Sequence, residues 1–212
     1  LFRSSAASDV YKRQGEVPPD RNPQCEQIIS ELDVNVDLVR KKLEGLNRFK
    51  GCDPDNIHPH VLRETAQSIS LPITMIYRES LRTGETPEDW RKANVTPIFK
   101  KGDRNDPTNY RPISMTSQVC RILESIVRDH MVEHLKENNL LNDGQHGFRE
   151  GRSCLTNLLT TLEDWTKILD EEDCVDSVYF DFRKAFNLVS HKHLLLKLCN
   201  LGIDGQVGSW IE

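Results

Sequence analysis

Six basic side chains stand between Trp90 and Pro112, accompanied by only two carboxylates. Six positive charges less two negative ones give this stretch a net charge of +4, in a chain whose formal net charge is -5 at pH 7. Lysine supplies a compact charge and arginine a two-pronged donor, a combination that suits a triphosphate or a nucleic-acid backbone. The stretch is therefore either a phosphate-binding site or a solvated hairpin face. The six cations are Arg91, Lys92, Lys100, Lys101, Arg104 and Arg111.

A second basic segment, "QHGFREGRSC", places Arg149 and Arg152 beside Phe148 and two glycines. Glycine permits close approach of a backbone and arginine binds phosphate, so the segment could contact a nucleotide or a template strand. The alternative is an ordinary connecting loop in which Ser153 caps the next helix.

Asp181 follows Val178, Tyr179 and Phe180, a composition typical of a short buried strand. Burying a lone charge is costly, so such an aspartate is expected to be paired, hydrogen-bonded or bound to metal. Mg²⁺ binds through one or two carboxylates together with substrate phosphates, which makes Asp181 a candidate magnesium ligand. A paired or capping aspartate is the other interpretation.

Several other functions find no support in the sequence. The six cysteines are scattered without a C-x-x-C pair, and we interpret them as reduced intracellular thiols. The histidines lack the spacing of a metal site, and we expect them to be surface or capping residues. No G-x-S-x-G or Walker-type loop occurs. No apolar run reaches the length of a membrane span, so no membrane partner is expected.

The elements that would position these residues form a mixed pattern, which predicts an α+β or mixed α/β domain. Apolar residues recur at helical spacing in five stretches, with a bend expected at Pro72, and alternation predicts a basic hairpin and one further strand. The expected helices span 25–46, 60–82, 117–141, 155–172 and 191–203, and the expected strands 93–100, 110–115 and 178–180. The helix over 117–141 is the clearest, and its expected buried residues are Val119, Ile122, Leu123, Ile126, Val127, Met131 and Leu135.

Three blocks occur in order along the chain: "ANVTPIFKKGDRNDPTNYRPISMTS", "QHGFREGRSCLTNLL" and "VYFDFRKAFNLVSHKHLLLKL". They resemble successive blocks of the reverse transcriptases of non-LTR (LINE-type, jockey-like) retrotransposons, and "GCDPDNIHPHVL" looks like a degraded copy of the preceding block. The resemblance covers about residues 45–212. It implies the fold of a right-hand polymerase, mostly helical with a basic β-hairpin and one palm strand. We expect a non-native tail over 1–14, an N-terminal helical segment over 15–44, fingers over 45–173 and the start of a truncated palm over 174–212.

The resemblance also assigns roles to individual residues. Asp181 would be the first catalytic carboxylate and would bind Mg²⁺, which is the expected cofactor of the complete enzyme. The partners implied are an RNA template, a DNA primer and dNTPs, in the nucleus and cytoplasm. The nucleotide-binding residues implied are Lys100, Lys101, Arg111, Phe182 and Phe186. The template-binding residues implied are Gln145, Phe148 and Arg149.

Two departures from the family pattern shape the expected activity. Asn187 stands where the family has a second aspartate, and no paired-aspartate turn occurs in this chain. Two-metal phosphoryl chemistry needs several converging carboxylates, so we expect a partial copy that is inactive alone. Two alternatives stay open: a non-catalytic transposon relic that at most binds nucleic acid, and a fragment of a polymerase like the group II intron maturases.

Overall fold

The computed structural model describes residues 23–51, 53–181 and 189–212, which form a mainly helical α+β structure. Helices supply the body, and the sheet is an antiparallel pair of strands. The helices are α2 (Val36–Glu44), α3 (Pro59–Glu64), α4 (Ala66–Thr83), α5 (Gln118–Glu137), α6 (Cys154–Asp170), α8 (His191–Asn200) and α9 (Gly205–Ile211), with 3₁₀ turns η1 (Glu88–Arg91) and η2 (Pro107–Asn109). The strands are β1 (Ala93–Phe99) and β2 (Tyr110–Thr116). Among the described residues, none of the helices is both long and apolar enough to cross a membrane.

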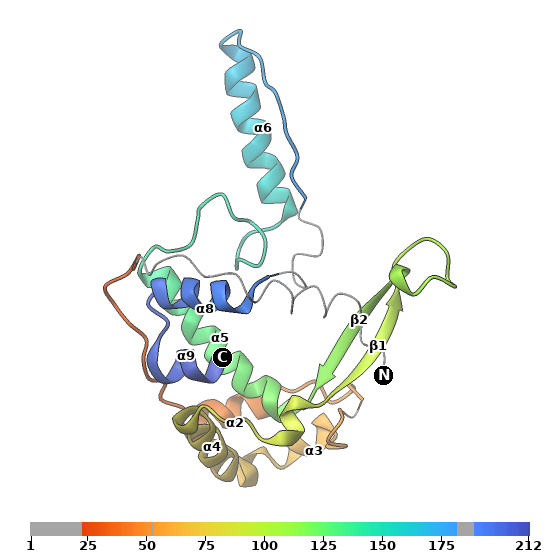
Figure 1. Cartoon of the computed structure of the whole chain (residues 1–212), viewed down its shortest axis with the longest axis vertical. Helices are drawn as coiled ribbons and strands as arrows, with labels where there is room; N and C mark the ends of the chain where they lie inside the picture. Colours follow the sequence, from red (N-terminus) through yellow and green to blue (C-terminus); the bar gives the residue numbers. More distant parts are fainter. Residues whose placement is uncertain (1–22, 52, 182–188) are drawn as a thin grey trace.

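The hydrophobic core lies where α2, α4, α5 and α9 meet (Figure 1). Tyr77 of α4 is fully buried at its centre, and its hydroxyl donates to the Val119 carbonyl of α5 at 2.6 Å. Trp90 packs edge-on against Tyr77, with ring centroids 5.9 Å apart. The predicted buried side of α5 is confirmed for Ile122, Leu123, Ile126 and Val127, while Val119 and Met131 pack against the core at its edge.

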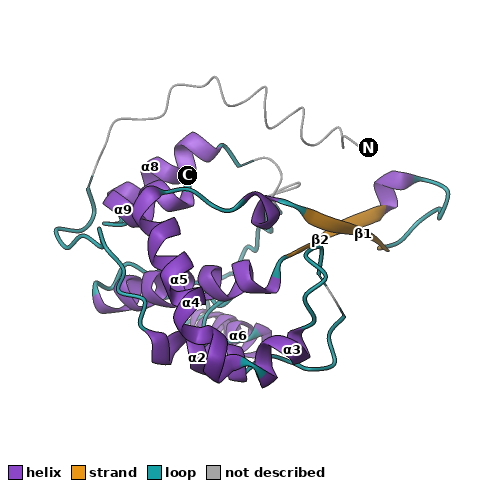
Figure 2. Cartoon of the chain, turned by 90° about the horizontal axis from the view of Figure 1, so that it is seen from below, coloured by secondary structure: helices purple, strands orange, loops and turns teal. Residues whose placement is uncertain are grey.

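The predicted hairpin is confirmed, and it projects from one side of the helical body (Figures 1 and 2). Most of its side chains are exposed, because the two strands pair with each other and with no other described strand. Pro97 faces Pro112 across the pair. Both strands are edge strands, where a missing backbone N–H is tolerated.

The helix predicted over 25–46 is present only as α2, which begins after Asn35. Residues 24–30 instead run beside the turn between α8 and α9, with Ile29 N–H donating to the Gly202 carbonyl at 2.8 Å. The Asn35 side chain accepts from Leu38 N–H and starts the helix. Long-range backbone hydrogen bonds thus replace the local helical ones expected from the apolar spacing.

The helix predicted over 60–82 is divided at Thr65 into α3 and α4, and Pro72 lies inside α4. The Thr65 hydroxyl donates to the Val61 carbonyl at 2.7 Å, which satisfies a helix-end acceptor at the break. His58 caps α3, as expected of a capping histidine. His134, by contrast, is not at the surface: it is buried and lies 2.8 Å from the Leu201 carbonyl.

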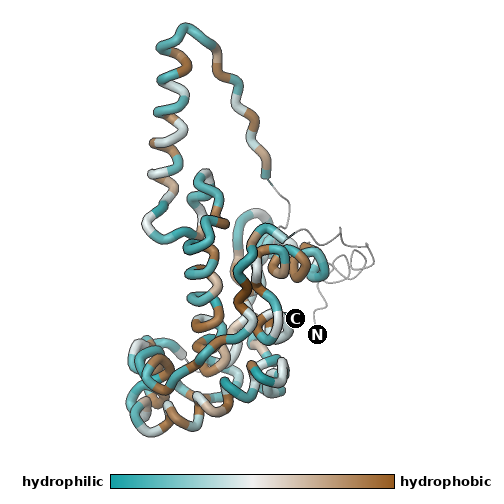
Figure 3. The backbone as a smooth tube through the Cα atoms, turned by 90° about the vertical axis from the view of Figure 1, so that its left-hand side faces the viewer, coloured by the Kyte–Doolittle hydropathy of each residue, from teal (hydrophilic) through white to brown (hydrophobic). Residues whose placement is uncertain are grey.

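Helix α6 stands away from the body, and residues 173–181 run back from its far end (Figure 1, Figure 3). Ser153 caps α6 in a capping box with Thr156, which confirms the predicted cap. The buried strand predicted at 178–180 is absent: Val178 is 74% exposed and no described strand pairs with it. A strand requires a partner for its backbone groups, and composition alone does not supply one. The described part of the chain therefore contains no palm strand.

Candidate nucleic-acid interface

One face of the hairpin combines two cations with an apolar surface. Alternation along the strands places Lys100 on the side of Ile98, and the register pairs Ile98 with Arg111. Two further apolar residues of β2 follow on this face, Ile113 and Met115, and each apolar side chain is between 36% and 48% exposed. Sequence reasoning selected the cations but missed the apolar residues, although the alternation in "TPIFK" and "RPISM" contains them. Apolar side chains beside cations can contact a base or sugar while the cations bind a neighbouring phosphate.

The cations near the tip of the hairpin are available for a ligand. Among the described residues, Lys100, Lys101 and Arg111 are exposed and form no ion pair. Lys92, at the base of the same hairpin, is within 3.1 Å of Asp89 and 3.3 Å of Glu88. Hydrogen bonds from Lys92 to Asp89 and Glu88 raise the pKa of Lys92. The hairpin thus contains one neutralised cation at its base and unneutralised ones near its tip.

The tip of the hairpin is ordered by its own side chains. Arg104 lies over the ring of Phe99, 5.3 Å from its centroid, and the Tyr110 hydroxyl donates to the Arg104 carbonyl at 2.9 Å. Gly102 has φ of +93°, and a Cβ there would come within 2.7 Å of the Asn109 side chain. The side-chain contacts of Arg104 and the close packing at Gly102 favour a single conformation of the turn. The backbone that carries Lys100 and Lys101 is therefore fixed.

The loop over 142–153 is held together around Asp143. Arg149 and Arg152 lie 3.7 and 3.4 Å from its carboxylate, and Arg149 also donates to the Asn142 carbonyl at 2.7 Å. Gln145 donates to the Gly147 carbonyl at 3.2 Å. Two of the three predicted template residues therefore bond within their own loop. The third, Phe148, is 97% exposed and has a left-handed backbone with φ of 58°.

Asp181 is exposed at the end of the segment that follows α6. Within the described residues, no three carboxylate, histidine or cysteine side chains gather closely enough to hold a metal ion. The predicted nucleotide-contacting Phe182 and Phe186, and the departure at Asn187, lie outside the described residues. No hydrogen bond between described residues joins Asp181 to the hairpin or to the loop at 142–153.

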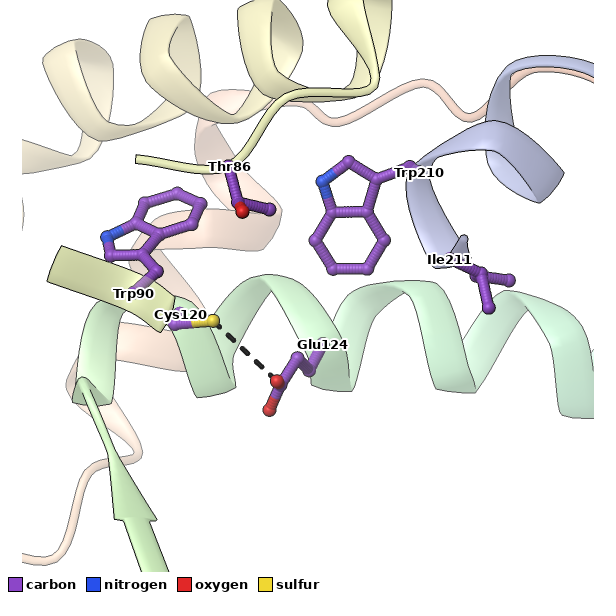
Figure 4. A pocket seen from close by; sticks show the side chains of 6 residues that line it. All are labelled: Thr86, Trp90, Cys120, Glu124, Trp210 and Ile211. Atoms are coloured by element: carbon purple, nitrogen blue, oxygen red, sulfur yellow. Dashed lines mark hydrogen bonds between the residues drawn. The ribbon is translucent and has the colours of Figure 1, made fainter. Parts of the chain in front are cut away.

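A cavity of about 300 Å³ opens above α5, between the two indoles of Trp90 and Trp210 (Figure 4). The Cys120 thiol lies 3.6 Å from Glu124 Oε1 at its edge. Burial, reinforced by the charge of Glu124, raises the pKa of Cys120 to about 12. The thiol is therefore protonated at neutral pH and is a poor nucleophile. The lining residues are Thr86, Trp90, Cys120, Glu124, Trp210 and Ile211.

Comparison with known proteins identifies the family. Residues 98–212, more than half of the chain, match the family described as reverse transcriptase (RNA-dependent DNA polymerase). The chain belongs to the reverse transcriptase family. The match begins at Ile98 in the hairpin and continues through α9, so it includes the candidate cations Lys100, Lys101 and Arg111, the loop at 142–153 and Asp181.

Several curated relatives come from retrotransposable elements. A probable RNA-directed DNA polymerase from transposon BS of Drosophila melanogaster is 26% identical over 169 residues, 79% of this chain and 19% of that protein. A retrovirus-related Pol polyprotein from type-1 retrotransposable element R2 of Popillia japonica is 31% identical over 150 residues, 69% of this chain and 20% of that protein. The expected similarity to non-LTR retrotransposon polymerases is confirmed, and the chain spans about a fifth of the length of these relatives.

Proposed function

We propose that the hairpin binds the phosphates of a nucleotide or nucleic acid during RNA-directed DNA synthesis. The observation that carries the proposal is the pair of exposed cations, Lys100 and Arg111, on one face of a projecting hairpin, with no ion-pair partner among the described residues. Lys101, in the adjoining turn, adds a third charge. Membership of the reverse transcriptase family supports a phosphate ligand over a merely solvated surface.

The complete reaction would extend a DNA primer on an RNA template from dNTPs, and we propose Asp181 as one of its metal-binding carboxylates. Mg²⁺ would polarise the phosphate that is attacked. The described residues supply Asp181 without a cluster of further ligands, so they fit one coordination position and not a whole site. What the chain's own residues offer is a negative oxygen donor at Asp181 and positive donors on the hairpin.

We further propose that the loop at 142–153 contacts the template. Phe148 presents its ring to solvent, and exposed aromatic rings stack on unpaired bases without sequence preference. Arg149 and Gln145 support this role by ordering the loop, since their side chains donate to the carbonyls of Asn142 and Gly147. With 97% of its surface exposed, Phe148 would make the direct contact.

The salt dependence of RNA binding tests the proposal. Fluorescence anisotropy of a labelled single-stranded RNA gives the association constant over a range of roughly 50–200 mM KCl, where phosphate contacts weaken steeply. The association constant falls as salt rises, and each lost phosphate contact makes the plot of log K against log salt less steep by about 0.7 for single strands. The double variant Lys100→Ala with Arg111→Ala should therefore reduce the steepness by about 1.4. Lys92→Ala is the matched control, because Lys92 is already paired with acidic residues, and its slope should equal that of the wild type. If the double variant has the wild-type slope, the hairpin is not part of the RNA-binding site.

A further inference from the structure

The hairpin is attached to the body at two places. Before β1, Trp90 is buried against Tyr77. After β2, the chain passes directly into α5, whose first turn contains Arg121. The strands between these points are mostly exposed, so the direction in which the hairpin projects depends on its two ends.

Arg121 joins the second attachment to a distant loop. Its guanidinium donates twice to the carbonyl of Thr116, the last residue of β2, through Nε at 3.0 Å and Nη2 at 2.6 Å. The same Nη2 lies 2.6 Å from Asp53 Oδ1. A planar guanidinium that bonds two acceptors at once fixes their relative orientation, which a lysine could not do. Arg121 therefore holds the terminal peptide of β2 against the loop at 53–57.

Asp53 is well placed to orient Arg121. It is 5% exposed, and within the described residues its Oδ2 is buried with no hydrogen-bond partner. Its ion-pair partner is Arg121. Because an unpaired buried carboxylate would be strongly unfavourable, Asp53 holds Arg121 in place. Asp55 makes a second connection, because its Oδ2 accepts from the Ser117 hydroxyl at 2.7 Å. Ser117 precedes α5, where the helix dipole favours negative charge.

We propose that Asp53 and Arg121 are positioning residues that set the direction of the phosphate-binding hairpin. We call the contacts of Asp53, Arg121 and the Thr116 carbonyl the clasp. The functional consequence of the clasp rests on the proposed function: the clasp would align Lys100 and Arg111 with a bound nucleic acid. The clasp itself is a property of the unbound chain.

The length of the strands amplifies a small change of direction at their base. A strand of seven residues extends for roughly 23 Å, so a rotation of about 20° at its base would move the tip by about 8 Å. Loss of the clasp frees the Thr116 peptide to rotate while the pairing of β1 with β2 is unchanged. The hairpin should then remain folded but take several directions.

Distance measurement by double electron–electron resonance tests the clasp. Nitroxides attached to encoded ketone-bearing residues at Asn105 in the tip and Glu133 on α5 leave the native cysteines in place. The wild type should give one narrow distance peak, and Asp53→Asn should abolish it in favour of a spread of distances about 8 Å wide. Asp129→Asn is the matched control: Asp129 of α5 also makes an ion pair to a distant element, with Lys42 of α2, but it has no contact with the hairpin among the ion pairs and hydrogen bonds of the described residues. Its peak should stay narrow.

A second variant covers the case in which Asp53→Asn fails to fold, as judged by circular dichroism. Arg121→Lys keeps the charge but cannot reach both acceptors in one plane, so it should also lose the narrow peak. A folded Asp53→Asn or Arg121→Lys variant with the wild-type peak would overturn the clasp. These measurements contain no RNA. Failure of the Lys100 and Arg111 variants to weaken RNA binding would therefore refute the proposed function and leave the clasp standing.

Discussion

Replacing Gly202 by alanine should push the backbone of the N-terminal segment near Gln27 away from the turn between α8 and α9. Gly202 has φ of +82°, and an added Cβ would lie 2.2 Å from the Gln27 carbonyl oxygen and 2.9 Å from His134 Nε2. The left-handed backbone alone costs alanine about 1–2 kcal/mol. The carbonyl belongs to the backbone, so the clash cannot be relieved by a change of rotamer.

Relief of the clash requires the backbone between Gln27 and Ile29 to move, while the hydrogen bonds that Gln24 and Ser30 make to the same turn can remain. Two hydrogen bonds would then be lost, from Ile29 N–H to the Gly202 carbonyl at 2.8 Å and from Asp204 N–H to the Ile29 carbonyl at 3.2 Å. At about 1 kcal/mol each, they bring the total loss of stability to about 3–4 kcal/mol. For a chain of this size, that corresponds to a fall in Tm of roughly 10 °C.

Thermal unfolding followed by circular dichroism measures this effect, and Gly151→Ala is the matched control. Gly151 has a similar φ of +73°, but nothing lies within 4 Å of its ideal Cβ position. Its replacement should lower stability by the backbone penalty alone, about 1–2 kcal/mol. Equal losses in the two variants would mean that Gln27 does not approach Gly202 in solution, and would refute the docking of the N-terminal segment.

Two other perturbations test the core. Tyr77→Phe removes the hydroxyl that bonds the Val119 carbonyl at 2.6 Å, and should cost about 1–2 kcal/mol in a urea titration; no loss would mean that the hydrogen bond is absent. The pKa of Cys120 is raised by burial from 9.0 to about 12, so the folded chain keeps a proton that the unfolded chain loses. The contribution of the protonated Cys120 thiol to the free energy of unfolding is complete below pH 9 and is lost as the pH rises toward 12. The urea midpoint should therefore decrease as the pH rises above 9, and decrease less in Cys120→Ala; identical pH profiles of the two proteins would contradict the raised pKa.

The elements that sequence analysis predicted best are those fixed by neighbouring residues. The hairpin follows from alternation on both sides of a turn that contains Gly102 and Asp103, and α6 begins at the Ser153 cap. In α5 the apolar stripe is long enough for its spacing to be unmistakable, and Ile122 and Ile126 are buried as expected. In each case the decisive contacts join residues close in sequence.

The errors arise where distant residues decide. Ile29 has the spacing of a helical residue, but it bonds the backbone of Gly202 and takes an extended conformation. The sequence predicts a surface histidine at His134, because nothing local indicates that the turn at Leu201 covers it. Val178 has strand composition without a described strand beside it. Such pairings are a property of the tertiary fold and not of the local sequence.

The sequence predicts which basic residues belong to the candidate site, but not which of their side chains are free of ion pairs and can bind a ligand. A count of charges treats Lys92 and Lys100 alike. The structure shows that Lys92 is paired with Asp89 and Glu88, whereas Lys100 forms no ion pair among the described residues. Arg149 was selected as a template contact, but its guanidinium is engaged by Asn142 and Asp143. Because a cation already paired gains less from a phosphate than an unpaired one, the hairpin is the stronger candidate of the two basic segments.

The clasp gives the "GCDPDN" block a physical role that its sequence does not reveal. Asp53 lies 68 positions before Arg121, and nothing in the sequence connects the two residues. Their contact matters because an exposed hairpin has little else to orient it: its strands bury almost nothing, and a small rotation at Thr116 is amplified along their length. A surface that must meet a phosphate chain needs its cations at defined positions, since misplaced charges lose the bidentate contacts that arginine provides. An ion pair between buried Asp53 and partly buried Arg121, at the base of β2, meets that need without occupying the binding face.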